Sequence, residues 1–410
     1  MASREFLYEK FAEYYSKSSL NLPSPALMEQ REFGFLLLKE RAMIRHRSFI
    51  EIQALKRFLS QSVPSDVYHS CAYYENPSFE MNRKGWLGAD LVFDIDADHI
   101  PTTCNRLHDE WICGKCGFKG NGSSPKLCPV CSGVKFETKT WPCELCLGSA
   151  KNETAKLIDM LEKDFGLSPD DVHVFFSGHR GYHVQVEAEV FRTLDAMARK
   201  EIVDYVSGLG IEFLNPSSAE KPRSKRSLRR PSFHLHDFGW NGRLKEGMRR
   251  FVMNATKDDL KAIGIRSDAL LKNREAVLQR CFEEGRWDSV KGVSVEKTWL
   301  KIARHIGKVE SAKIDTVVTT DIHRLIRMDG TLHGKTGLLK TEFPAETLVD
   351  FDPFEEAVAF KSGTAKVFVS DAPEFRLGGS VFGPYKEQKV EVPTAAAVLL
   401  ICKDRAEVAT

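Results

Sequence analysis

The segment GADLVFDIDADHI, Gly88–Ile100, joins the pattern of a β-strand to four aspartates. Its apolar side chains fall on alternate positions, at Leu91, Phe93 and Ile95. Side chains alternate between the two faces of a strand, so these three residues share the face that packs on a core. Asp94 and Asp96 then project together from the opposite face. The pattern therefore predicts a strand over Trp86–Asp96 that presents a pair of acids.

Two neighbouring carboxylates raise each other's pKa and destabilise the fold unless something balances their charge. An exposed sheet face and a strand end paired with arginines both meet this requirement. A divalent cation also meets it, because Mg²⁺ and Mn²⁺ prefer hard oxygen ligands. The segment alone leaves these three interpretations open. The outer acids Asp90 and Asp98 are expected to be strand-end residues.

The 410-residue chain has an ordinary globular composition, with 42% hydrophobic and 28% charged residues. Its length predicts two or three packed units. The N-terminal segment lacks the apolar core of a signal peptide, and no run approaches the roughly 18 apolar residues that cross a bilayer. We therefore expect an intracellular protein without a membrane span. The formal net charge is only +2, but KPRSKRSLRR, 221–230, is strongly basic and is either a solvated loop or a phosphate contact.

The order of patterns predicts an α/β (α+β) fold with a mixed-sheet core. REFGFLLLKERAMIRHRSF, 31–49, is typical of a hairpin, KNETAKLIDMLEKDFG, 151–166, of a helix, and DVHVFFSG and GYHVQVE of two strands. The last 60 residues have a mixed β and loop pattern that ends in a helix. We expect a catalytic core of residues 1–103, 147–215 and 305–410. A zinc-binding insertion is expected at 104–146, with its inner ribbon at 113–131, and a largely helical subdomain with the basic run at 216–304.

Ten cysteines in an intracellular chain indicate metal binding rather than disulfides. The pairs CGKC and CPVC have the two-knuckle spacing of a ribbon that holds one Zn²⁺ on four thiolates. We name these ligands the inner cluster: Cys113, Cys116, Cys128 and Cys131. A second set surrounds it and is named the outer cluster: Cys104, His108, Cys143 and Cys146. About two structural zinc ions per chain are therefore predicted, with a plain loop histidine as the alternative for His108.

The stretch FFSGHRGYHVQV, 175–186, places polar side chains around two glycines. Its hydroxyl, guanidinium and imidazole groups belong to Ser177, His179, Arg180 and His183. A glycine turn can aim such groups and its own backbone N–H groups at one anion. An ordinary polar hairpin turn is the alternative.

The stretch KIDTVVTTDIHRLIRMDGTLHGKTGL, 313–338, offers a third acid followed by basic groups. We expect Asp315 at a strand end, Arg324 and Arg327 on one face of a following helix, and His333 and Lys335 in a loop with glycines. An acid with several cations fits a metal-bound triphosphate. A solvated helix face with a polar loop is the alternative.

Taken together, these stretches resemble the catalytic small subunit of the archaeal and eukaryotic DNA primases. The resemblance rests on DLVFDID, SGHRGYHVQV and DTVVTTDIHRLIRMDGTLHGKTGL, with further similarity in REFGFLLLKERAMIRHRSF, HDFGWNGR and VEVPTAAAVLLICKDRAEV. It spans essentially the whole chain in the family's order, and HDFGWNGR is similar to the archaeal branch. It implies a DNA-templated nucleotidyltransferase that makes short RNA primers for replication, with DNA primers left open. It also implies a large primase subunit as partner, a single-stranded DNA template, NTPs or dNTPs, and a cytoplasmic or nucleoid-associated location.

The resemblance also implies roles for individual residues. Mg²⁺ or Mn²⁺ would be held by Asp94, Asp96 and Asp315. The nucleotide phosphates would be held by Ser177, His179, Arg180, His183, Arg327 and His333. Glu32 and Arg45 match polar residues near the initiating nucleotide. The outer cluster matches the family's single zinc site, whereas the inner cluster departs from the family pattern.

Three other functions remain open at this stage. A polymerase of the same superfamily acting in end-joining repair or lesion bypass would carry the same residues. A non-catalytic zinc-containing nucleic-acid adaptor is disfavoured because three carboxylates and a basic set are present. A metal-dependent nuclease fits the two neighbouring aspartates but gives the triphosphate-binding set no purpose.

Overall fold

The chain is described in a computed structural model, which covers residues 2–409 apart from 18–19, 101, 212–236, 267, 288–289 and 295–297. The chain divides into two compact units. Unit 1 comprises Met1–Ile158, Leu167–Lys200 and Lys313–Thr410, and unit 2 comprises Asp159–Gly166 and Glu201–Ala312. The expected zinc-binding and helical subdomain boundaries stay predictions, and the basic run at 221–230 lies outside the described residues.

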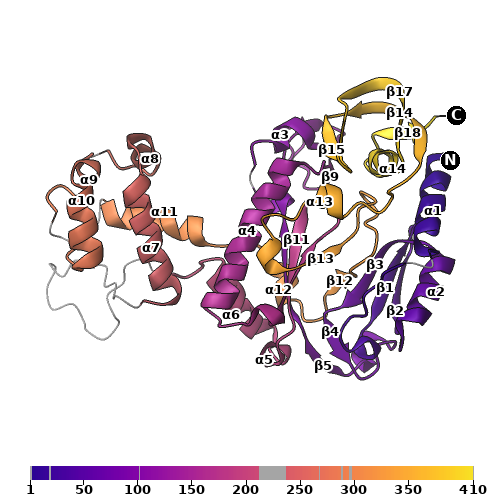
Figure 1. Cartoon of the computed structure of the whole chain (residues 1–410), viewed down its shortest axis with the longest axis horizontal. Helices are drawn as coiled ribbons and strands as arrows, with labels where there is room; N and C mark the ends of the chain where they lie inside the picture. The colour runs from indigo at the N-terminus through magenta and orange to yellow at the C-terminus, as the bar shows by residue number, and fades with distance from the viewer. Residues whose placement is uncertain are drawn as a thin grey trace. The chain divides into compact units, whose positions relative to one another are not determined.

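The first sheet of unit 1 has the strand order β12-β3-β1-β2. These strands are β1 (Phe33–Leu37), β2 (Met43–Arg47), β3 (Pro64–Ser70) and β12 (Leu325–Arg327). The predicted hairpin is confirmed, because β1 pairs antiparallel with β2. Helices α1 (Ala2–Tyr15) and α2 (Ile52–Ser62) cover this sheet (Figure 1). Their apolar side chains pack with those of the sheet in one core that includes Phe11, Phe33, Phe35, Leu55 and Leu59.

The second sheet has the order β13-β10-β11-β6. Its strands are β6 (Leu91–Asp96), β10 (Val172–Phe176), β11 (Gly181–Val186) and β13 (Thr341–Phe343). The antiparallel register of β11 with β6 sets His183 opposite Asp94 and Gly181 opposite Asp96. The predicted mixed α/β architecture is confirmed. Within the described part of the chain the named strands pair antiparallel, so the sheets are not mixed in strand direction.

The strand predicted over Trp86–Asp96 is broken at Asp90. β5 (Trp86–Ala89) pairs with β4 (Ala72–Tyr74), and β6 begins after the break. The Asp90 side chain is buried, where it accepts hydrogen bonds from Arg31 Nη2 at 2.7 Å and Tyr73 Oη at 2.6 Å. Asp90 was expected to be a strand-end residue, and it lies at the break between β5 and β6 with its charge balanced by Arg31.

The prediction of a helix that carries Arg324 and Arg327 is wrong. Helix α12 (Thr316–Thr320) lies before these residues, and Leu325–Arg327 form strand β12, which pairs with β3. Asp315 is the N-cap of α12 rather than a strand residue, because its carboxylate accepts from the N–H of Val317 at 2.9 Å. Pairing with the edge of β3 favours a strand at Leu325–Arg327, although the β-branched run Thr316–Thr320 before it is helical.

The remaining elements complete the two units. In the expected zinc insertion lie α3 (Asn105–His108), β7 (Glu110–Cys113), β8 (Lys119–Asn121) and β9 (Phe136–Lys139). Helix α4 (Glu144–Lys163) begins earlier than predicted, and α5 (Glu189–Arg192) and α6 (Ala196–Val206) follow the second sheet. The helices of the predicted helical region are α7 (Gly239–Asn254), α8 (Lys257–Ala262), α9 (Ala269–Lys272), α10 (Arg274–Val277) and α11 (Leu300–Glu310). The C-terminal region contains α13 (Pro353–Glu356), β14 (Thr364–Ala372), β15 (Phe375–Leu377), β16 (Ser380–Phe382), β17 (Tyr385–Pro393), α14 (Thr394–Cys402) and β18 (Ala406–Val408).

A search of the described helices for a membrane span found none that combines the necessary length and apolar character.

Candidate active site

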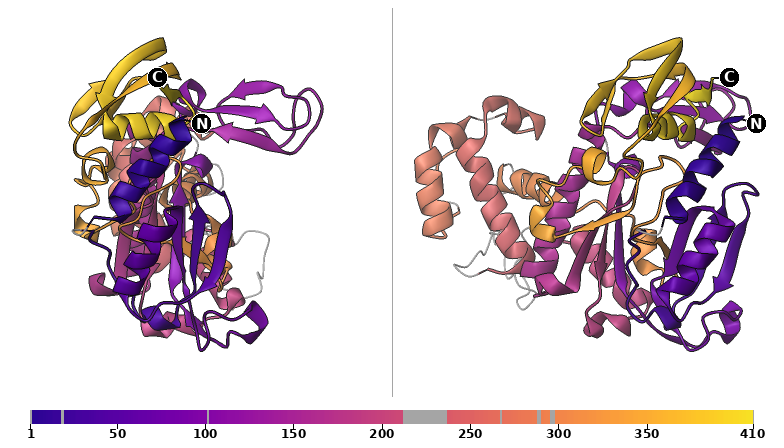
Figure 2. Two further views of the ribbon diagram at one scale, coloured as in Figure 1. Left: turned by 90° about the vertical axis from the view of Figure 1, so that its right-hand side faces the viewer. Right: turned by 45° about the vertical axis from the view of Figure 1, so that its right-hand side comes forward.

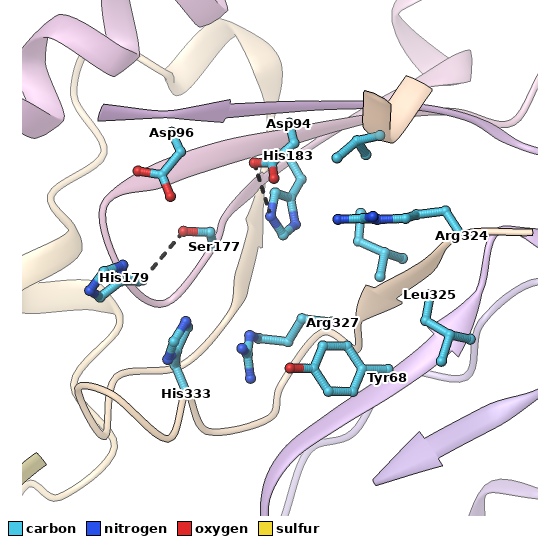
Figure 3. A pocket seen from close by; sticks show the side chains of 12 residues that line it. Tyr68, Asp94, Asp96, Ser177, His179, His183, Arg324, Leu325, Arg327 and His333 are labelled. Atoms are coloured by element: carbon cyan, nitrogen blue, oxygen red, sulfur yellow. Dashed lines mark hydrogen bonds and ion pairs between the residues drawn. The ribbon is translucent and has the colours of Figure 1, made fainter. Parts of the chain in front are cut away.

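A cavity of about 180 Å³ opens between the two large sheets of unit 1 (Figure 3). Seven of its lining residues were predicted from the sequence: Asp94, Asp96, Ser177, His179, His183, Arg327 and His333. Arg324, which the sequence placed among the cations for a triphosphate, also lines the cavity. Four more lining residues were not assigned to the site: Tyr68, Val318, Leu325 and Ile326. Sheet strands therefore bring together residues that are more than 200 positions apart in the chain.

The acids of β6 form one wall of the cavity. Asp94 and Asp96 both line it, as the alternation predicted. His183 Nε2 lies 3.5 Å from an oxygen of Asp94. Asp315 is not among the lining residues, but its backbone N–H donates to the carbonyl of Asp94 at 2.8 Å. This bond fixes the start of α12 against the strand that carries the acid pair.

Two glycines allow the turn between β10 and β11 to lie against its neighbours. A Cβ on Gly181 would fall 2.1 Å from the carbonyl oxygen of Ile95, so a side chain there would force β11 away from β6. Gly178 has a φ of +85°, and a Cβ on it would lie 2.9 Å from Cβ of His333. The sequence between these glycines therefore folds close to both the acid strand and the loop of His333.

The opposite wall of the cavity is rich in imidazole and guanidinium groups. The rings of His179 and His333 stack with centroids 5.1 Å apart. Burial lowers the pKa of both histidines and of His183 well below the usual value, so all three are neutral at neutral pH. Arg327 is buried beside Asp66, which accepts from its Nη1. The arrangement can hold an anion with a permanent cation and several neutral donors, opposite two carboxylates.

Comparison with known proteins places this geometry in a family. Residues 137–344 match the family described as DNA primase small subunit. The DNA primase small subunit PriS of Nitrosopumilus maritimus is 33% identical over 407 residues, which are 99% of this chain and 98% of that protein. The PriS of Methanoregula boonei is 35% identical over 426 residues, 100% of this chain and 99% of that protein. The chain belongs to the DNA primase small subunit family. The primase match includes β10, β11 and the segment of Asp315 to His333, and the full-length similarity also covers β6.

Arg180 was predicted to bind phosphate, but its side chain does not line the cavity. The side chain is fully buried. Its Nη1 lies 2.8 Å from Asp98 and 2.9 Å from Asp109, and its Nη2 donates to Sγ of Cys146 at 3.3 Å. The sequence prediction considered only an external anion, whereas two carboxylates and a thiol of the chain itself surround this guanidinium.

Glu32 and Arg45 lie together, but not at the cavity. The buried carboxylate of Glu32 accepts from Arg45 Nε at 3.0 Å and from Lys84 Nζ at 2.8 Å. These hydrogen bonds lower the pKa of Glu32 despite its burial. Their expected role beside an initiating nucleotide stays a prediction.

The two predicted zinc clusters assemble in the structure. Within each cluster the four ligand atoms lie within 4.8 Å of one another, and all ten cysteines are free thiols. The Sγ atoms of Cys104 and Cys146 are 3.3 Å apart, and those of Cys116 and Cys128 are 3.7 Å apart. A tetrahedral zinc with Zn–S bonds of about 2.3 Å needs sulfur separations of about 3.8 Å, so both clusters fit zinc. Among the described residues the three aspartates do not form a third such group.

His108 is held as a zinc ligand is usually held. Its Nε2 lies 3.5 Å from Sγ of Cys146, while its Nδ1 lies 2.7 Å from Asp109. A carboxylate on the second nitrogen orients a metal-binding imidazole and fixes its tautomer. The alternative of a plain loop histidine does not explain this pair of contacts.

Sequence reasoning missed Lys403, which lies at the end of α14. Its Nζ is 2.6 Å from Nε2 of His179, and the side chain is buried. Burial lowers the pKa of Lys403 to about 7. The two side chains form a hydrogen bond whose direction depends on the tautomer of His179. Local sequence patterns could not predict this contact, because the two residues are 224 positions apart.

Proposed function

We propose that this chain is the catalytic subunit of a DNA primase, a nucleotidyltransferase that joins nucleotides on a single-stranded DNA template to make short primers. The observation that carries the proposal is the cavity in which Asp94 and Asp96 face Arg327 and His333. A nucleoside triphosphate has the matching chemistry, because its phosphates need cations and its reacting centre needs carboxylate-held metal. RNA primers are the proposed product.

The reaction forms a bond between a sugar 3′-oxygen and the α-phosphorus and breaks the bond to the departing pyrophosphate. Arg327 supplies a permanent positive charge for the phosphate oxygens, and Asp66 fixes the orientation of its guanidinium. His179, His333 and Ser177 offer hydrogen bonds from the wall of the cavity. Donors placed where charge develops stabilise the transition state more strongly there than in bulk water.

Asp94, Asp96 and Asp315 would hold Mg²⁺ or Mn²⁺. Bound there, divalent ions would lower the pKa of the attacking hydroxyl and neutralise charge on the reacting phosphates. His183, 3.5 Å from Asp94, restricts the rotation of that carboxylate. The two zinc clusters lie outside this chemistry, because four protein ligands leave a zinc ion no open position.

The partner, the substrates and the cellular location are part of the same proposal. We propose that the large primase subunit is the partner, that NTPs or dNTPs are the substrates, and that the protein acts in the cytoplasm at the nucleoid. The relatives named above are called small subunits, which supports an assembly with a second subunit.

The test is primer synthesis on a single-stranded template with NTPs and Mg²⁺ or Mn²⁺, in the absence of any primer. We expect new oligonucleotides from the native chain and a loss on the order of a hundredfold or more for Asp94→Asn. Asp170→Asn, at an exposed acid, is the matched control and should stay active. Extension only from a supplied end would instead assign a repair polymerase, and degradation of the template a nuclease.

A further inference from the structure

The inner cluster organises a ribbon that the proposed chemistry does not use. We define the zinc ribbon as residues 110–139, with the sheet order β8-β7-β9. It projects from the rest of unit 1 (Figure 2, left). Trp111 is its small core, in edge contact with Phe136 at 5.3 Å between ring centroids. A Cβ on Gly120 would fall 2.3 Å from the Trp111 ring, so the strands close tightly around this side chain.

The surface of the zinc ribbon is strongly basic. Its exposed lysines are Lys115, Lys119, Lys126 and Lys135. The acids of the same segment are Glu137, which is exposed, and Glu110, whose side chain is 42% exposed and lies 3.4 Å from Arg405. Within the described part of the chain, no ion pair engages any of the four lysines. Four positive charges therefore point into solvent with little to balance them.

Large apolar side chains lie among these lysines. The exposed fractions are 43% for Phe118, 58% for Leu127, 64% for Val130 and 68% for Val134. Exposed apolar groups gathered on one small module indicate a contact surface. Protein interfaces are depleted in lysine, whereas surfaces that bind single strands combine lysines for phosphates with aromatic and apolar groups for bases. The charge and the apolar groups together favour nucleic acid over a protein partner.

The base of the zinc ribbon lies close to the cavity. β7 begins at Glu110, directly after Asp109. Asp109 accepts from Arg180, and Arg180 follows the cavity residue His179 in the chain. The base of the ribbon is therefore joined to the chain beside the cavity by this ion pair.

We propose that the zinc ribbon is an accessory surface that binds single-stranded nucleic acid beside the active site. The four lysines contact phosphates, and the exposed face of Phe118 stacks on a base. The ribbon thereby holds the template outside the cavity. The inference rests on the proposed function for the identity of the ligand, but not on the catalytic residues.

The test compares two quadruple variants of the full chain. The ribbon variant replaces Lys115, Lys119, Lys126 and Lys135 by Gln. The control variant replaces four exposed lysines of the C-terminal region by Gln: Lys361, Lys366, Lys386 and Lys389. Both remove the same charge, so a nonspecific loss of positive potential affects them equally. Circular dichroism and zinc content verify that each variant is folded.

The readout is the Kd for a long fluorescent oligothymidylate across a salt series. Each phosphate contact with a single strand contributes about 0.7 to the slope of log Kd against log salt. We expect the ribbon variant to bind at least about tenfold more weakly and to lose roughly 3 from this slope, while the control variant changes little. Phe118→Ala should weaken binding at every salt concentration and leave the slope unchanged.

Several results would overturn the inference. Equal binding by the ribbon and control variants removes the special role of the ribbon. A ribbon variant that binds the oligonucleotide normally but no longer binds the purified large subunit assigns a protein-docking surface instead. A failure of the proposed function gives a different result from a failure of this inference. In that case the native chain still binds the oligonucleotide through the ribbon but makes no primers.

Discussion

The outer and inner clusters lie in one segment, 104–146, but they are connected to the rest of the chain in different ways. The outer cluster touches Arg180 through Cys146, and His108 touches Asp109, which holds the same arginine. The inner cluster contacts mainly its own knuckles, with Cys113 and Cys131 Sγ atoms 3.5 Å apart. Two clusters of similar ligands therefore have different structural roles. The outer cluster is connected to the acid strand by hydrogen bonds and ion pairs, whereas the inner cluster organises the projecting zinc ribbon.

The connection of the outer cluster to the acid strand has three steps. Asp109 orients His108 and accepts from Arg180. Arg180 pairs with Asp98, whose backbone N–H donates to Asp96 at 3.0 Å. A change at the outer cluster should therefore reach a cavity acid, and a change at the inner cluster should not.

The largest expected effect separates the clusters directly. Cys146→Ala should lower primer synthesis at least about tenfold and reduce Tm, because a structural zinc site contributes folding energy and also holds its neighbours. Cys128→Ala, in the inner cluster, should leave synthesis on a short template nearly unchanged. Elemental analysis should find about two zinc ions in the native chain and about one in each variant. Equal loss of activity in the two variants would contradict the distinction.

The next effect concerns the arginine between the outer cluster and the acid strand. Arg180→Gln leaves buried Asp109 without its cation, which should cost about 3–5 kcal/mol of unfolding free energy. Guanidinium-induced unfolding measures this loss, with Arg57→Gln at an exposed pair as the control. Kinetics distinguish two roles: a fall in kcat fits an arginine that positions the acid strand, whereas a rise in KM for NTP alone fits a phosphate ligand.

The next prediction concerns Lys403, whose buried charge is influenced by Arg180 beside the outer cluster. Its pKa is lowered to about 7, mainly by burial and then by Arg180. Between pH 7 and its unfolded value of about 10.5, the unfolded chain binds a proton that the folded chain has released. This group therefore makes stability rise with pH in that window, by at most about 1.4 kcal/mol per pH unit.

Lys403→Met should remove this part of the rise, so the variant gains stability relative to the native chain as pH falls from 9 to about 7. Unfolding curves at several pH values measure the difference. Lys389→Met, at an exposed residue, should follow the native pH profile. If Lys403→Met also follows it, Lys403 is not the group that titrates.

The smallest effect is expected where the zinc ribbon meets the C-terminal region. Arg405 lies 3.4 Å from both Glu110 and Asp371, and the two acids are 42% and 63% exposed. Arg405 is largely buried, but both acids reach solvent, so each pair should contribute only about 0.2–1 kcal/mol. Glu110→Gln should therefore change Tm only slightly and leave the zinc content unaltered. A large loss of stability would show that the ribbon is tied to the fold more firmly than its contacts indicate.

The acid strand was accessible from sequence because strand alternation is local. Asp94, Asp96 and His183 were all predicted from patterns of a few residues, and they line one cavity. The zinc clusters were equally accessible, because metal geometry restricts ligand spacing. Such features depend on neighbours in the chain, which a single sequence displays.

Other features depend on residues that are distant in the chain. Arg180 looked like a phosphate ligand because nothing nearby revealed Asp109 as its partner. Arg327 was predicted on a helix, since the strand that pairs with it, β3, lies far upstream. The sequence pattern around Lys403 predicted a terminal helix and gave no sign of a contact with His179. In each case a tertiary partner decided the outcome, and periodicity carries no information about that partner.

Gly181 has a consequence for how the gene can vary. Every missense change at its codon introduces a Cβ, and any Cβ there would meet the backbone of β6. The obstacle is a carbonyl oxygen rather than a flexible side chain, so no second substitution nearby can clear the space. In a saturation library we expect this position to tolerate only synonymous changes. The position of Asp94 and Asp96 on β6 thus depends on a glycine that has no side chain of its own.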